Sequence, residues 1–446
     1  MKKYKLGIIT TLLIVLVVLL VLYTSWQNKS YKDAVHTDAT TIIKINLVAL
    51  GKTIAWDYLG NWKYYSSKDI DSIKSTHKKE NGINIPANLF LYTVPKASNT
   101  VFCTLQISDS TQAISYLSKE LGLSQDIKEE KFYHRTNKKG TISLAQLDQT
   151  IILAFSYKKE GTSKVFEDLL VDKKYMMPTH DLLQKAKKEE HHLSILEKKN
   201  SILSLDSKDG KIEFTSKIKN SSYIHIKETQ EVPSFSKKSS IQMYIAGDIK
   251  DNVYLQNKLE NILRWDTTPL FKNYNGLLSF QLKGHTLQKD SIITYEYTDD
   301  FEKVPVVSIK EKKVPKMMFS FKTDSTNSIE SFLKNKGIIS ENRFVKQMPL
   351  YQYYAKQKAN EFKISTSKDF MASFQKTEIS TTFFRILILI DPLLKENHFP
   401  IINPYISSMT SIDIKAKKVA AQSIDLKGII TFKENTINAL TQILKK

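Results

Sequence analysis

Cysteine is almost absent from this chain of 446 residues, which contains only Cys103. One cysteine cannot close an intramolecular disulfide, so a disulfide-stapled scaffold is excluded, and thiolate metal clusters need several sulfurs. Cys103 lies in the apolar segment Val101 to Leu105. We therefore expect it to be a small buried side chain and not a nucleophile.

Glycine is also scarce, with 13 residues, and no two glycines are closer than the eight positions between Gly276 and Gly284. This spacing excludes the glycine-rich dinucleotide fingerprint and the Walker phosphate loop, both of which need closely spaced glycines. The motifs H-E-x-x-H and G-x-S-x-G are absent as well. The sequence therefore shows no motif for a nucleotide cofactor, a zinc protease or a serine hydrolase.

Arginine accounts for only four of the 66 basic residues, and the net charge is +20. Arginine is the side chain that reads phosphates and bases in a bidentate manner, and the lysines are spread along the chain, so nucleic acid is not the expected partner. A diffuse positive field suits attraction to anionic lipid head groups or envelope polymers. The alternative explanation is a genome-wide preference for lysine codons.

The N-terminal region contains 23 uncharged residues from Leu6 to Asn28, preceded by Lys2, Lys3 and Lys5. As a helix this segment would be about 34 Å long, enough to cross a hydrocarbon core of about 30 Å. The positive-inside rule then predicts that residues 1–30 form a cytoplasmic stub and a transmembrane signal-anchor in the bacterial inner membrane, with the rest periplasmic. A cleaved signal peptide is the alternative, but no A-x-A-like site follows the span.

Short β-branched or aromatic segments are repeatedly followed by a capping residue and a helical pattern. The clearest case runs from Val101 to Ile107, then Asp109 and a helix through Lys119, and similar patterns follow Phe321 and Phe432. These units predict an α+β fold after the transmembrane helix. Pro233 and the polar segment after it suggest two mixed strand/helix domains, 31–235 and 236–446. The recurrence of these units is explained either by their common ancestry or by the limited chemistry of helix capping.

Two groups of residues were considered as reactive sites. The first is the helical pattern that contains His180, Asp181, Glu189, Glu190, His191 and His192. His180 and His191 would lie on one helix face but about 16 Å apart, too far for one metal ion, so we expect a solvated surface helix. The second is the S-x-x-K spacing at Ser331 and Ser373, which lacks the accompanying S-D-N and K-T-G motifs. No catalytic, cofactor-binding or metal-binding residue is therefore predicted.

The lysine-rich N-terminus, the apolar segment, the strand-like Ala39 to Leu47 and the recurrent strand-cap-helix units resemble uncharacterised membrane-anchored bacterial envelope proteins, of the kind described as domains of unknown function. The resemblance covers most of the chain in outline and implies no catalytic residues.

We therefore expect a single-pass envelope protein with a non-catalytic binding or scaffolding role, whose protein partners the sequence does not identify. One alternative is a lipid- or polymer-handling module with an apolar groove built from strands such as Phe383 to Ile390, which we otherwise expect to be a buried strand. A second alternative is a hydrolase with dispersed catalytic residues. The repeated units also predict that Ile114, Leu117, Ile329 and Phe332 face a layer of strands.

Overall fold

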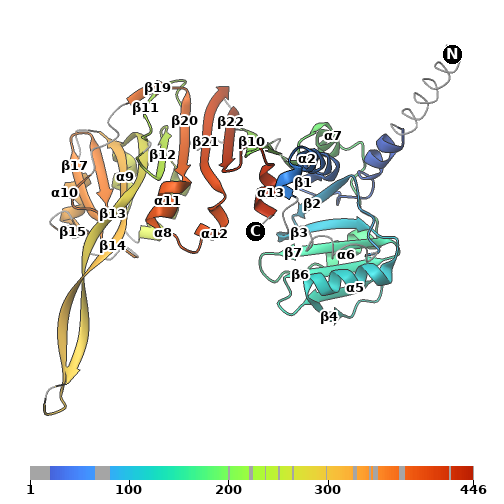
Figure 1. Cartoon of the computed structure of the whole chain (residues 1–446), viewed down its shortest axis with the longest axis horizontal. Helices are drawn as coiled ribbons and strands as arrows, with labels where there is room; N and C mark the ends of the chain where they lie inside the picture. The colour runs from blue at the N-terminus through green and yellow to red at the C-terminus, as the bar shows by residue number, and fades with distance from the viewer. Residues whose placement is uncertain are drawn as a thin grey trace. The chain divides into compact units, whose positions relative to one another are not determined.

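The computed structural model describes residues 21–65, 81–198, 201–219, 225–236, 238–249, 252–263, 266–297, 299–324, 329–340, 343–344, 350–370, 377–420 and 423–444. The chain forms two compact units (Figure 1): Met1–Asp209 with Thr436–Thr441, and Gly210–Asn435 with Gln442–Lys446. The division between Asp209 and Gly210 lies upstream of the domain boundary expected between residues 235 and 236.

The first unit is built around an antiparallel sheet. Its strands are hydrogen-bonded in the order β4 (Leu123–Ile127), β5 (Tyr133–Asn137), β6 (Ile142–Leu147), β7 (Thr150–Ser156), β3 (Ala97–Gln106), β2 (Asn88–Val94), β1 (Thr41–Asn46), β8 (Leu193–Glu197) and β9 (Ile202–Lys208). Helices α2 (Leu47–Gly60), α3 (Trp62–Tyr65), α5 (Ser110–Leu121), α6 (Ser163–Leu170) and α7 (Asp181–Lys188) complete this unit, and α13 (Ala439–Leu444) lies at the end of the described chain.

Alternating apolar residues give the first sheet a core on each face. Phe102 and Ile152 pack with Phe166 of α6 and Leu183 of α7 on one face. Their neighbours Cys103, Ile151 and Leu153 pack with Ala113 and Leu117 of α5 on the other. Both faces of this sheet are therefore covered by helices.

Helix α5 begins where the sequence places its cap. The Asp109 carboxylate accepts a hydrogen bond from the backbone N–H of Gln112 at 2.9 Å, which satisfies one of the free amides of the first turn. Gly122 ends the helix with a φ of 64°, a left-handed conformation that glycine adopts without strain. The predicted unit of β3, cap and helix is confirmed here.

The second unit is a longer antiparallel sheet. Its order is β10 (Lys211–Lys219), β22 (Ser423–Phe432), β21 (Met409–Ala420), β20 (Thr382–Leu389), β12 (Ile241–Ala246), β13 (Tyr274–Tyr297), β14 (Lys303–Thr323), β18 (Glu361–Ser365), β17 (Tyr354–Lys358), β16 (Arg343–Phe344) and β15 (Ile339–Ser340). A separate pair, β11 (Gln230–Pro233) and β19 (Thr377–Ser380), and helices α8 (Val253–Leu263), α9 (Thr268–Asn273), α10 (Ile329–Asn335), α11 (Ile390–Glu396) and α12 (Asn403–Ile406) complete it.

Strands β13 and β14 are much longer than their neighbours. Strand β12 pairs with β13 only from Leu277 to Leu282, and β18 pairs with β14 only from Met318 to Lys322. Beyond these positions β13 and β14 pair with each other as far as Tyr297 and Lys303. The result is the two-stranded hairpin that extends beyond the adjoining strands in Figure 1.

The predicted fold class is wrong, because antiparallel strands dominate the structure. The two longest strands, β13 and β14, pair directly with each other instead of alternating with helices. Among the described residues no helix is long and apolar enough to cross a membrane. Of the predicted span Leu6 to Asn28, residues 6–20 lie outside the described part, and residues 21–28 are helical. Residues 325–328, which follow the expected cap Asp324, also lie outside the described part.

The four residues expected to face strands do pack inward. Leu117 and Ile329 are buried, and Ile114 and Phe332 pack against the same apolar clusters. We expect Ile329→Ala to lower the free energy of unfolding by about 2 to 5 kcal/mol, because it leaves a cavity beneath α10. Asn335→Ala, at the exposed end of the same helix, should change it by less than about 0.5 kcal/mol.

Urea denaturation of the full-length variants tests this expectation, and equal losses for the two would contradict it. Glu330, also in α10, is a poorer control than Asn335. Its carboxylate accepts a hydrogen bond from the backbone N–H of Gln357 at 2.8 Å and pairs with Lys334 at 2.7 Å.

Candidate functional site

The register of the second sheet places apolar side chains side by side across seven strands, from β10 to β14. Directly paired residues of an antiparallel sheet point to the same face. One such row is made by Phe214, Gly428, Ile414, Ile386, Met243, Phe280 and Phe319. The flanking rows on the same face run from Ile212 to Met317 and from Ser216 to Phe321, and Ser216 is their only polar member. We call these three rows the apolar face.

The apolar face is not fully enclosed by the rest of the unit. Every non-glycine side chain of its central row is only partly buried, including those of β20, which the sequence predicts to be a buried strand. The opposite face is polar, with a row made by Thr215, Lys427, Lys415, Arg385, Tyr244, Ser279 and Ser320. Contiguous apolar surfaces are a common feature of interaction sites in proteins.

Gly428 shows how closely packed the apolar face is. An ideal Cβ built on Gly428 would lie 1.9 Å from the tip of the Phe214 ring, so the ring rests directly over the glycine backbone. Glycine at this position lets an aromatic side chain of β10 lie flat across β22. At this position the Phe214 ring therefore occupies the space that a side chain of β22 would otherwise take.

The hairpin continues this surface. Alternation along β14 places Ile309, Val307 and Pro305 on the same side of the strand as Phe319. Ile309 and Val307 are 69% and 63% exposed, and Ile293, which pairs with Val307, is 59% exposed. On the same side the ammonium group of Lys303 lies 4.5 Å from the centre of the Tyr295 ring.

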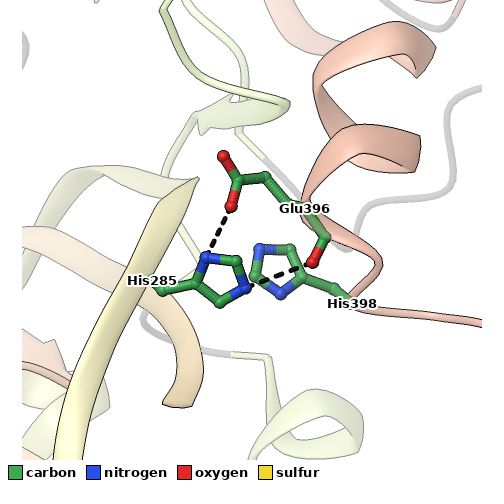
Figure 2. A group of neighbouring side chains, drawn as sticks. All are labelled: His285, Glu396 and His398. Carbon is green, nitrogen blue, oxygen red and sulfur yellow. Dashed lines mark hydrogen bonds and ion pairs between the residues drawn. The ribbon is translucent and has the colours of Figure 1, made fainter.

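At the base of the hairpin, three side chains converge (Figure 2). His285 follows a bulge in β13 at Gly284, where φ is 61°. Glu396 is the last residue of α11, and Asn397 then adopts a left-handed conformation, φ 51°, which turns the chain so that His398 returns beside it. The ligand-type atoms of the three side chains all lie within 4.8 Å of one another. We call this group the His–Glu–His cluster.

Hydrogen bonds hold both imidazoles of the cluster. Nδ1 of His285 lies 2.5 Å from Oε2 of Glu396, and its Nε2 lies 3.1 Å from the backbone oxygen of the same residue. The His398 ring bonds to the backbone of Gly284, while its Nε2 is buried without a partner. Burial and then the neighbouring His285 lower the pKa of His398, against the opposing effect of Glu396.

The histidine-rich segment considered from sequence has a different structure from the one predicted. Helix α7 ends at Lys188, and the expected surface helix continues instead as β8 from Leu193. His180 caps α7 by accepting a hydrogen bond from the backbone N–H of Leu182. His191 bonds to Asp206 at 2.7 Å, and the buried His192 accepts a hydrogen bond from the backbone N–H of Ser207.

The sequence candidates for nucleophiles have ordinary structural surroundings. Cys103 is 3% exposed, and burial raises the pKa of its thiol to about 12, so it is a thiol at neutral pH. Ser331 lies on the exposed side of α10, and the lysine of its S-x-x-K spacing, Lys334, pairs with Glu330. Ser373 lies outside the described residues.

Two clefts occur in the first unit beside residues 26–33. One, of about 330 Å³, is lined by Trp26, Lys29, Asn88 and Phe90 among others. The second, of about 400 Å³, includes Tyr31, Lys32 and Lys187. Their volumes are at the lower end of those that hold small ligands.

Comparison with solved structures finds weak similarity to TP0453. Its crystal form IV matches with a TM-score of 0.26 and 12% identity over 42% of this chain and 84% of that chain. Its crystal form I gives a TM-score of 0.22 and 9% identity over 74% and 89%. Scores this low establish neither a shared fold nor a shared function. No protein-family model matches the chain, and no curated protein matches it.

Proposed function

We propose that this chain is a non-catalytic binding protein of the bacterial envelope that holds the acyl chains of lipids on its apolar face. The observation that carries this proposal is the run of three apolar rows across seven strands, whose central row is only partly buried on one side of the second sheet. Seven strands span about 29 Å. That width accommodates an extended hydrocarbon chain lying across the strands.

The chemistry of the apolar face favours acyl chains over an envelope polysaccharide. A sugar chain needs hydrogen-bonding partners, and unpaired polar groups are costly on an apolar surface. The central row offers isoleucine, methionine and phenylalanine side chains and the backbone of Gly428. The net charge of +20 favours lipids with anionic head groups.

Binding of a fluorescent long-chain fatty acid to the full-length chain tests this function. We expect saturable binding that unlabelled palmitate displaces and that soluble peptidoglycan fragments leave unchanged. Absence of saturable binding, or displacement by the glycan fragments alone, would contradict the proposal.

We also propose that the chain is held at the inner membrane by its apolar N-terminal segment, with the region after Tyr31 on the periplasmic side. This rests on Lys2, Lys3 and Lys5 preceding the segment Leu6 to Asn28. An alkaline phosphatase reporter fused after Lys446 should be active, and a fluorescent protein that matures only in the cytoplasm should be dim at the same position. The reverse pattern would place the region in the cytoplasm.

A further inference from the structure

The His–Glu–His cluster has the donor set of a zinc site. Two imidazole nitrogens and one carboxylate oxygen are the ligands of many Zn²⁺ centres that keep a fourth position open. Here they come from the base of β13 and the end of α11, and Figure 2 shows the three side chains facing one another. Their ligand-type atoms lie within 4.8 Å of one another, so small side-chain rotations would bring them around one ion.

The backbone selects one nitrogen of each ring for a metal. A histidine that binds metal normally donates its other ring N–H to a carbonyl or carboxylate, which fixes the tautomer. The backbone oxygen of Glu396 lies 3.1 Å from Nε2 of His285 and leaves Nδ1 directed at the carboxylate. The buried Nε2 of His398 has no hydrogen-bond partner. Nδ1 of His285 and Nε2 of His398 are therefore the ring nitrogens available as ligands.

The unpartnered Nε2 of His398 distinguishes this cluster from an ordinary ion pair. His285 and Glu396 alone satisfy each other, and a salt bridge would need no third member. Yet the His398 ring lies 4.5 Å from the His285 ring, centre to centre, and buries a nitrogen without a hydrogen bond. Buried polar atoms are nearly always satisfied in native proteins. A bound cation would satisfy this one.

We propose that His285 Nδ1, Glu396 Oε2 and His398 Nε2 bind one divalent transition-metal ion, with Zn²⁺ the best match to these donors. Irving–Williams preferences and the mixed nitrogen and oxygen ligands favour Zn²⁺ over Mg²⁺ or Ca²⁺, which take oxygen ligands. The ion would link β13 to α11 across 111 residues of sequence and so fix the base of the hairpin.

Titration of the metal-stripped full-length chain with Zn²⁺ and Co²⁺ tests the site. We expect one ion per chain by calorimetry, together with the visible absorption of Co²⁺ in a low-symmetry nitrogen and oxygen site. His398→Ala should weaken binding by at least about tenfold, and Glu396→Gln by a similar factor. The matched control is His191→Ala, which removes a histidine beside Glu189 and Asp206 in the first unit and should leave binding unchanged.

The results of these titrations distinguish a metal site from a salt bridge and from a lipid-binding site. Loss of the ion in His398→Ala but not in His191→Ala supports the proposal. Equal binding by wild type and His398→Ala, loss in His191→Ala, or no bound ion in the wild type would overturn it. Circular dichroism of each variant checks the fold, and Ca²⁺ in place of Zn²⁺ should give no binding. None of these readouts depends on the apolar face.

Discussion

Replacing Ile386 by glutamine should weaken fatty-acid binding by about 10- to 100-fold. Ile386 lies in the central row of the apolar face, between Met243 and Ile414. A bound acyl chain would leave the new amide without hydrogen-bond partners, which costs about 1 to 3 kcal/mol. Glutamine is uncharged, so the change does not alter attraction of the fatty-acid carboxylate.

The matched control for Ile386→Gln is Ile429→Gln. Ile429 is 43% exposed on the opposite, polar face of the neighbouring part of the sheet, beside Glu213 and Asp413. This variant should bind the fluorescent fatty acid as the wild type does. Titration of both variants measures the difference, and equal affinities would show that the apolar face does not hold the ligand.

Asp168→Asn should lower the stability of the first unit by about 3 to 5 kcal/mol. Asp168 is fully buried, and its two carboxylate oxygens contact Lys96 at 2.5 Å and Lys174 at 2.7 Å. The variant loses the charge-assisted hydrogen bonds that the buried carboxylate accepts from the two lysines, each worth about 1.5 to 3 kcal/mol. The control is Asp181→Asn, since Asp181 is 76% exposed in its pair with Lys185 and should lose less than about 1 kcal/mol. Urea denaturation at pH 7 compares them.

The same carboxylate predicts an acid-dependent loss of stability. Burial raises the pKa of Asp168, but the hydrogen bonds from Lys174 and Lys96 outweigh it and bring the pKa to about 2. An unfolded aspartate has a pKa of about 3.9, so this stabilisation is fully present above that value and is lost as pH falls from there toward 2. Asp168→Asn should be less sensitive than the wild type between pH 5 and pH 2. Identical pH profiles would contradict this assignment.

Local signals in the sequence predicted individual elements well. The N-cap at Asp109 and the helix after it are confirmed, because capping depends on residues three or four positions apart. The strand expected from Phe383 to Ile390 is present as β20, Thr382–Leu389. The fold class was not predicted, because the pairing of β12 with β20 joins residues more than 130 positions apart in the sequence. Only the register of this pairing shows which side chains lie on the same face of the sheet.

The same limit applies to both candidate sites. The sequence of each strand of the apolar face, taken alone, is typical of a buried strand. The partial exposure of its side chains depends on which other elements cover the sheet. His285 and His398 stand far apart in the sequence and match no spaced metal motif. A left-handed turn at Asn397 and a bulge at Gly284 bring them together, and neither feature is visible as a signal of metal binding.

Photo-crosslinking with a fatty acid that carries a diazirine near its methyl end tests the central claim most directly. After irradiation of the full-length chain, peptide mass spectrometry should find labels on the apolar face, on strands β12, β20 and β21, at residues such as Met243, Ile386 and Ile414. Excess palmitate should abolish the labels. Labels that persist with palmitate, or that concentrate around Trp26 and Phe90 in the first unit, would show that the apolar face of the second sheet is not the lipid site.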